Sequence, residues 1–207
     1  MLAAVIMGPL LSRLRVDHAA PYSFKFSGFT LWLLVANTED VQHVIDEFNP
    51  NCPRRIAHST LEYGLRLDEA TARARFEKLR AAIAGTGPVA LPCGGPQMFG
   101  DYSPFQMRVI GLAFGGRPGL DALRLRAADA FEVPPRGSHF QHASMVYDWI
   151  GSTRVNETVV DDIRRRYPAL DQGREIVFDG VALVAMEGRG VGEWEVLDRI
   201  DLRPPAS

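Results

Sequence analysis

Two short segments of the chain carry the same arrangement of a histidine and a hydroxyl group. Residues 58–61 read HSTL and residues 142–145 read HASM, so that each follows the order histidine, any residue, hydroxyl, apolar residue. Imidazole titrates near neutral pH, and two histidines can therefore divide the roles of general acid and general base. A hydroxyl group beside them can donate a hydrogen bond to an oxygen on which negative charge develops. The two segments predict acid–base chemistry on a centre that gains negative charge.

The spacing within each segment places the two functional groups together if the segment is a β-strand. Residues i and i+2 of a strand point to the same face, so His58 lies beside Thr60 and His142 beside Ser144. One such tetrapeptide is weak evidence, because a single histidine is more often structural and either hydroxyl can be an ordinary strand residue. Two copies at equivalent places of a duplicated chain are much stronger evidence for a catalytic pair.

The order of expected elements supports a duplication. Apolar and amphipathic patterns predict a strand, a helix, a histidine-containing segment, a helix and a strand, and this series runs twice before a final strand. The first copy is expected at 29–35, 38–48, 56–61, 68–84 and from 89, the second at 105–114, 120–131, 141–146, 156–167 and 176–186, and the final strand at 194–202. His58 and His142 are 84 residues apart, as are Thr30 and Phe114 in the two leading strands. Any chain of alternating strands and helices can be cut into similar pieces, so this spacing alone does not prove a repeat.

The two motifs resemble those of the 2H phosphoesterase superfamily, and more narrowly those of its cyclic phosphodiesterases. An aromatic residue, Tyr147, follows the second motif, and the segment 187–202 is similar to the closing hairpin of the family, so the resemblance spans roughly residues 29–202. It implies an α+β fold of two lobes, in which duplicated antiparallel sheets are backed by helices and face a central cleft.

The resemblance also implies an activity that needs neither a metal nor another cofactor. A 2′,3′-cyclic nucleotide or a related cyclic phosphate is expected to be hydrolysed to a monoester by acid–base catalysis through His58 and His142. The hydroxyls of Thr60 and Ser144 are expected to bind the phosphate oxygens. Which histidine is the base and which is the acid stays open. Two alternatives also stay open: an enzyme that trims or ligates RNA ends, and a degenerate module that binds a nucleotide without turnover.

Several nearby residues have competing interpretations. Tyr147 and Trp149 are candidates for a wall that stacks on a nucleobase, although either can belong to the core. His139 and His142 invite a metal pair, but residues three apart on a strand point to opposite faces. The glycine-rich segment 188–192 lies between two strands with no helix after it, so it is read as a hairpin turn and not as a phosphate loop.

Composition limits the class of partner. The chain has 207 residues with 23 basic and 25 acidic side chains, which gives a formal net charge of −2. Binding to long nucleic acids normally requires a basic surplus, so a small anionic substrate is the better match. No apolar run approaches the roughly 18 residues that cross a bilayer, and a membrane protein is not expected. The oligomeric state is left open.

The N-terminal segment and the two cysteines bear on the domain boundaries and on the cellular compartment. The apolar stretch 1–11 lacks the preceding basic residues of a secretory signal, so residues 1–20 are read as an extension and residues 21–207 as one two-lobed catalytic domain. Two cysteines, Cys52 and Cys93, cannot form a disulfide framework or a four-ligand zinc site. Although one bridge is possible, two thiols in a reducing cytoplasm are expected.

Overall fold

The computed structural model describes residues 26–36, 39–48, 56–102, 107–115, 118–135, 141–149, 156–189 and 193–204. The expected extension 1–20 and the side chains of Cys52 and His139 lie outside these ranges. Within them, no helix combines the length and the apolar character that crossing a membrane requires.

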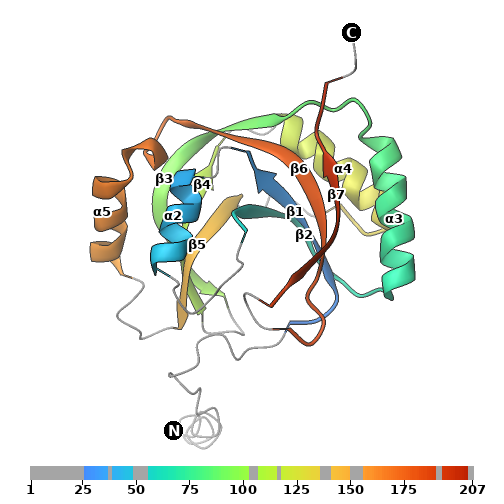
Figure 1. The fold of residues 1–207 in the computed structure, drawn as a ribbon, viewed down its shortest axis with the longest axis horizontal. Helices are drawn as coiled ribbons and strands as arrows, with labels where there is room; N and C mark the ends of the chain where they lie inside the picture. Colours follow the sequence, from blue (N-terminus) through green and yellow to red (C-terminus); the bar gives the residue numbers. More distant parts are fainter. Residues whose placement is uncertain are drawn as a thin grey trace, which may run out of the picture.

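The order of the elements confirms the predicted series of strand, helix, histidine strand, helix and strand, run twice (Figure 1). The strands are β1 (Phe29–Val35), β2 (His58–Leu65), β3 (Val89–Tyr102), β4 (Met107–Phe114), β5 (His142–Trp149), β6 (Glu175–Ala185) and β7 (Glu195–Asp201). The helices are α2 (Glu39–Phe48), α3 (Glu69–Ala82), α4 (Pro118–Phe131) and α5 (Glu157–Arg166), followed by the single 3₁₀ turn η1 (Pro168–Leu170).

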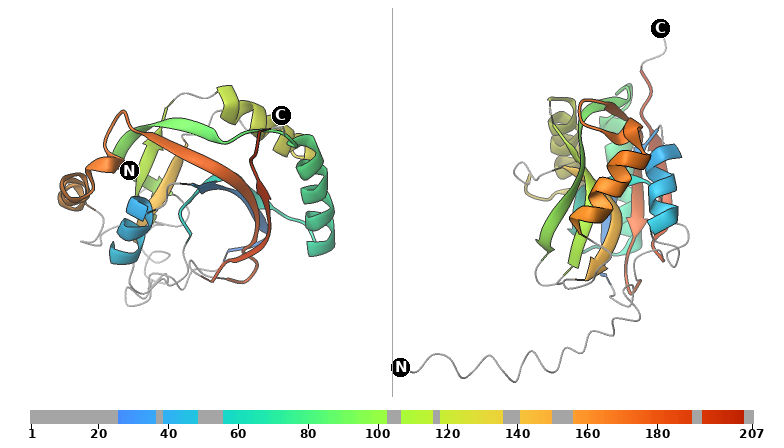
Figure 2. Two further views of the ribbon diagram at one scale, coloured as in Figure 1. Left: turned by 45° about the horizontal axis from the view of Figure 1, so that its top comes forward. Right: turned by 90° about the vertical axis from the view of Figure 1, so that its left-hand side faces the viewer.

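All the strand pairs are antiparallel, and they form one strongly curved sheet in the order β1-β2-β5-β4-β3-β6-β7, in which β1 also pairs with β6 (Figure 2). In one lobe β1 lies between β2 and β6, and in the other β4 lies between β5 and β3. The last strand of each repeat therefore pairs with the first strand of the other repeat. This exchange joins the two halves into the predicted two-lobed α+β fold.

The helices cover one face of this sheet. Along β1, Phe29, Leu31 and the other odd-numbered residues belong to the main core, to which all four helices contribute apolar side chains. Trp32 and Leu34 point the other way and form a separate small cluster. Helices α3 and α4 lie together at one side, and α2 and α5 lie together at the other (Figure 2). The face with Trp32 and Leu34 is the one that carries the candidate site.

Two of the helices begin at a side chain that caps the first turn, and these are the first residues of the expected ranges 68–84 and 156–167. The side chain of Asp68 accepts a hydrogen bond from the backbone N–H of Thr71 at 2.8 Å at the start of α3. Asn156 accepts one from Val159 at 3.0 Å at the start of α5. Each cap satisfies a backbone donor that the first helical turn leaves without a partner. Thr38, the first residue of the expected range 38–48, lies outside the described residues.

Strand β3 is much longer than the segment that the sequence predicts. Residues 89–92 pair with β6, whereas β3 from Cys93 onward pairs with β4. The register shifts between Cys93 and Pro96, where Gly95 has a positive φ of 79°. Proline and glycine are disfavoured inside a strand, so the pattern predicted only its start. In the fold they form the bulge at which β3 passes from one lobe to the other.

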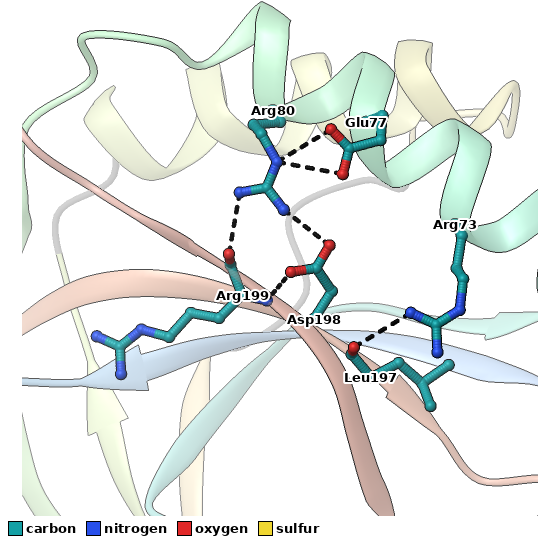
Figure 3. Close-up of polar contacts among 6 residues, drawn as sticks. All are labelled: Arg73, Glu77, Arg80, Leu197, Asp198 and Arg199. Carbon is teal, nitrogen blue, oxygen red and sulfur yellow. Dashed lines mark hydrogen bonds and ion pairs between the residues drawn. The ribbon is translucent and has the colours of Figure 1, made fainter.

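The outer strand β7 is fastened to α3 by two arginines (Figure 3). Arg73 donates to the carbonyl of Leu197 at 3.2 Å, and Arg80 donates to the carbonyl of Arg199 at 3.0 Å. Arg80 also binds the carboxylate of Asp198 at 2.7 Å. β7 is the last strand in the sheet order, and these guanidinium groups cover carbonyls that a lateral strand would otherwise bind.

Candidate functional site

The two histidine motifs meet where β2 and β5 touch. These strands are joined by one residue pair, Ser59 opposite Ala143, and both of these side chains are fully buried on the core side. Opposed residues share a face and neighbours along a strand alternate between faces, so the flanking residues all point to the other face. These flanking residues are His58, Thr60, His142 and Ser144.

Both repeats hold their motif in the same register against the leading strand. Leu34 pairs with His58 and Trp32 with Thr60 in the first repeat; Ala113 pairs with His142 and Gly111 with Ser144 in the second. The equivalent positions of the leading strands are therefore Leu34 and Ala113, which are 79 residues apart. The expected equivalence of Thr30 and Phe114, based on a shared spacing of 84 residues, is wrong because the segments between strand and motif differ in length between the repeats.

A bulge follows each motif at the same place. Leu61 is left out of the β1–β2 register, which steps from Thr60 to Glu62, and Met145 is left out of the β4–β5 register, which steps from Ser144 to Val146. An extra residue in one strand of a pair shifts the alternation of the side chains beyond it. Two bulges at the fourth motif position are structural evidence for the duplication that the sequence pattern suggested.

His58 is enclosed more than the sequence indicated. Its ring stacks on the indole of Trp32 with the centroids 3.6 Å apart and the planes 11° apart, and only 4% of the residue is exposed. Its Nδ1 lies 2.6 Å from the carbonyl oxygen of Ile56, to which it donates. In the neutral ring this contact keeps the hydrogen on Nδ1 and the lone pair on Nε2, so that Nε2 is the atom suited to exchange a proton.

His142 lies against a phenylalanine ring instead. Phe99 of β3 stacks on it with the centroids 4.6 Å apart and the planes 24° apart. The approach of Phe99 depends on Gly111, because a Cβ at that position would lie 3.1 Å from the Cε2 atom of Phe99. Each imidazole is thus supported by an aromatic ring, from β1 in the first repeat and from β3 in the second.

Three of the other residues that the sequence singled out, Thr60, Ser144 and Tyr147, lie on the face of the histidines. Thr60 is exposed and Ser144 is partly buried, both on the face of the histidines. The bulge at Met145 turns Tyr147 to this face too, where it packs with Val109 in a cluster to which Phe26, Phe99 and Trp194 also belong. The backbone of Trp149 pairs with β4, and its side chain lies outside the description.

Solved structures that are similar to this chain share this architecture. Usb1 from Kluyveromyces marxianus is 13% identical, with 84% of this chain and 96% of that chain covered and a TM-score of 0.51. TT0787 from Thermus thermophilus is 14% identical, with 86% and 99% covered and a TM-score of 0.51. E. coli LigT in complex with NADP+ is 14% identical, with 86% and 98% covered and a TM-score of 0.51. The described residues therefore have the same fold as these three structures. No family profile and no curated protein sequence matches the chain.

Aromatic residues that did not stand out in the sequence also lie at this site. Trp32, Phe99 and Trp194 surround the two imidazoles, and the ring of Trp194 lies 6.3 Å from His58 with its plane tilted by 75°. The indole N–H of Trp194 is buried and has no hydrogen-bond partner among the described residues. An aromatic residue in a strand is ordinary, so nothing in the sequence distinguished these three from core residues.

Metal-ligating side chains do not gather in the part of the chain that the structure describes. It contains no group of three or more histidine, cysteine or acidic side chains placed to hold a metal ion. Cys93 is a buried free thiol, and burial raises its pKa above the ordinary value for a thiol. The side chain of Cys93 therefore has little thiolate character at neutral pH and belongs to the core.

Proposed function

We propose that this protein is a 2H phosphoesterase that hydrolyses a 2′,3′-cyclic nucleotide or a related cyclic phosphate to a monoester without a metal, which we expect it to do in the cytoplasm. The observation that carries the proposal is the pairing of Ser59 with Ala143, which turns both histidines and both hydroxyls of the motifs to one face of the sheet. Two groups that can act as acid and base then lie on the same face, on neighbouring strands.

In the proposed reaction each imidazole moves one proton. One ring takes a proton from water while the water oxygen bonds to phosphorus. The bond from phosphorus to one ribose oxygen breaks, and the other ring gives that oxygen its proton, so that the product is a phosphomonoester. Negative charge grows on the non-bridging oxygens, to which the hydroxyls of Thr60 and Ser144 donate hydrogen bonds.

The surroundings of the histidines support this reaction. Trp32 and Phe99 each stack on the face of one imidazole, so the ring edges, which carry the nitrogen atoms, are left for proton transfer. Tyr147 and Trp149 are the proposed contacts to the nucleoside part of the substrate, because aromatic rings stack on any base. E. coli LigT, which shares the fold, has been solved with ATP and with NADP+, so this fold accommodates nucleotides.

The direct test is incubation of the protein with 2′,3′-cyclic AMP in the presence of EDTA, followed by separation of the products. We expect a monophosphate, and its position on the ribose identifies the oxygen that leaves. Turnover that is confined to the ends of oligoribonucleotides would point to an RNA-end enzyme instead. Binding of the cyclic nucleotide without any product would indicate a module that has lost its activity.

A further inference from the structure

The backbone alone holds the two motif strands together weakly. β2 and β5 share one residue pair, whereas β1 pairs with β6 through seven residues and β4 pairs with β5 through seven. A strand register fixed by so few backbone hydrogen bonds can slip or open. The proposed reaction needs both imidazoles at fixed positions, one from each of these strands.

Hydrogen bonds from side chains on the core side of the sheet add to this single backbone pairing. The hydroxyl of Ser59 donates to the carbonyl oxygen of His142 at 2.5 Å. The amide nitrogen of Gln141 donates to the hydroxyl of Ser59 and to the carbonyl oxygen of Thr60, the latter at 3.1 Å. Each motif therefore has part of its backbone held by a side chain that lies in the other motif strand or directly before it.

The direction of this chain of hydrogen bonds is set by a third element. Arg124 of α4 donates to the side-chain oxygen of Gln141, so the amide must turn its nitrogen toward Ser59 and Thr60. Ser59 accepts from Gln141 and is left with its own proton for the carbonyl of His142. Donor and acceptor roles thus run one way, from Arg124 to the motif backbone, and bonds aligned in this way strengthen one another.

Burial makes these contacts costly to break. Ser59 is fully buried and Gln141 is 2% exposed, and 13% of the Arg124 side chain is exposed. A polar group that loses its partner in such a place is not compensated by water, so the arrangement favours one register of β2 against β5.

We propose that Ser59, Gln141 and Arg124 are positioning residues that hold the two catalytic motifs in register across the junction of the lobes. This inference rests on the proposed function for its catalytic consequence. It gives a role to Ser59, which occupies the variable position of the first motif, and to Gln141, which precedes the second. None of the three is expected to touch the substrate, because they act from the opposite side of the sheet.

The test compares Ser59→Ala and Ser59→Cys with the wild type. We expect kcat for the cyclic nucleotide to fall about 10–100-fold in Ser59→Ala, because a displacement near 1 Å costs that much, and less in Ser59→Cys, which keeps a weak donor of similar size. Arg124→Met, which removes the group that orients the amide, is expected to lower kcat as well. Val146→Ala is the matched control, because it also shortens a buried side chain, on the core side of β5. We expect a lower melting temperature with kcat within about threefold of wild type.

Two further readouts separate positioning from a general structural role. In a protein that already carries His142→Ala, adding Ser59→Ala should lower kcat by less than a further factor of about two. The reason is that Ser59 acts through the second motif, which His142→Ala has already disabled. An equal loss in both backgrounds would overturn the inference.

The second readout does not depend on activity. We expect Ser59→Ala to shift the ring NMR resonances of His58 and His142 and to leave those of the exposed His43 unchanged. Unshifted rings together with an unchanged kcat would refute the positioning role. If the wild type hydrolyses no cyclic phosphate, the proposed function fails, and the ring resonances still decide whether the three residues hold the motifs.

Discussion

At the scale of single residues, the two histidines are expected to contribute almost all the acid–base catalysis. Replacing either with alanine should lower kcat about 10²–10⁴-fold, which is the usual effect of one positioned acid or base. The double variant should lose far less than the product of the two losses, because groups that act together are not additive. Steady-state assays with 2′,3′-cyclic AMP measure this, with the exposed His43→Ala as the control.

The two histidines should differ in their effect on stability. The side chain of His58 is buried against Trp32, so its removal leaves a gap in a packed cluster, whereas His142 is only partly buried. We therefore expect His58→Ala to lower the melting temperature more than His142→Ala does. Turnover at the wild-type level in either variant would remove that residue from the reaction.

A second residue-scale prediction concerns Gly111. An added Cβ would lie 2.6 Å from the carbonyl oxygen of Ala143 and 3.1 Å from Phe99, so the backbone of β5 or the ring that supports His142 must move. Gly111→Ala should lower both the melting temperature and kcat. Gly87→Ala is the control, since its new Cβ would come no closer than 4.0 Å to another residue. Equal behaviour of the two variants would show that the site tolerates the shift.

What the sequence could reveal at this scale was limited to repeated residue types. His58 and His142 stood out because each is followed two residues later by a hydroxyl. Trp32 and Phe99 could not be assigned, since their place beside the imidazoles depends on pairing between strands far apart in the chain. Ser59 and Gln141 were missed for the same reason, because the hydrogen bonds with which they join the two motifs span more than 80 residues.

At the scale of elements, local pattern predicted most helices and strands and failed where two lobes share one strand. The caps Asp68 and Asn156 act on neighbours three residues away, so they could be read from the sequence. β3 could not be read in full, because its interior bulge at Gly95 makes sense only with β4 and β6 on either side of it. The bulges at Leu61 and Met145 are likewise visible only in the register.

The junction between α3 and β7 leads to a prediction at this scale. Arg80 binds Glu77, Asp198 and the carbonyl of Arg199 at once, and part of its side chain is shielded from water (Figure 3). We expect Arg80→Ala to lower the free energy of unfolding by about 1 kcal/mol, near the upper end for partly exposed ion pairs. Denaturant unfolding measures the change.

The matched control for Arg80 is Arg165→Ala. Arg165 is 77% exposed and pairs with Asp162 on its own helix, so its loss should change the free energy of unfolding by less than about 0.5 kcal/mol. Equal values for the two variants would mean that the contacts of Arg80 with β7 contribute nothing beyond a surface ion pair.

At the scale of the whole molecule, the two repeats are joined by contacts between their helices. α2 of the first repeat meets α5 of the second through Glu47, which binds Arg166 and accepts a hydrogen bond from Tyr167 at 2.7 Å. The hydrogen bonds from Arg166 and Tyr167 lower the pKa of Glu47 below its ordinary value. α3 and α4 are joined similarly, by Arg75 and Glu132 at 2.7 Å.

The lowered pKa of Glu47 predicts how this joint responds to pH. Its contribution to stability is fully present above the carboxyl pKa of the unfolded chain, about 4.3, and is lost as the pH falls through the lower folded value. Glu47→Gln should therefore lower the melting temperature at pH 7, and the difference from wild type should shrink as the pH falls below about 4. Melting curves across this range test it, and a difference that stays constant with pH would contradict the ionic origin.

The pH dependence of turnover is a property of the whole molecule, because each repeat supplies one histidine. In the proposed reaction the base must be neutral while the acid is charged, so we expect the singly protonated pair to be the active form. Below the lower apparent pKa no base remains, and above the higher one no acid remains. We expect a bell-shaped profile of kcat around neutral pH, whose two apparent values belong to the pair and not to either residue.

The effect of EDTA on this pH profile tests whether the reaction needs a metal ion. A reaction carried by His58 and His142 as acid and base should give the same curve with and without EDTA. Rates measured from about pH 5 to 9 on 2′,3′-cyclic AMP test both the shape and the insensitivity to chelator. In either single alanine variant one limb of the bell should flatten, because the group that titrates there is gone. Activity that disappears in EDTA and returns with zinc or manganese would instead indicate a metal-dependent phosphoesterase, and the acid and base roles assigned to the two histidines would then be wrong.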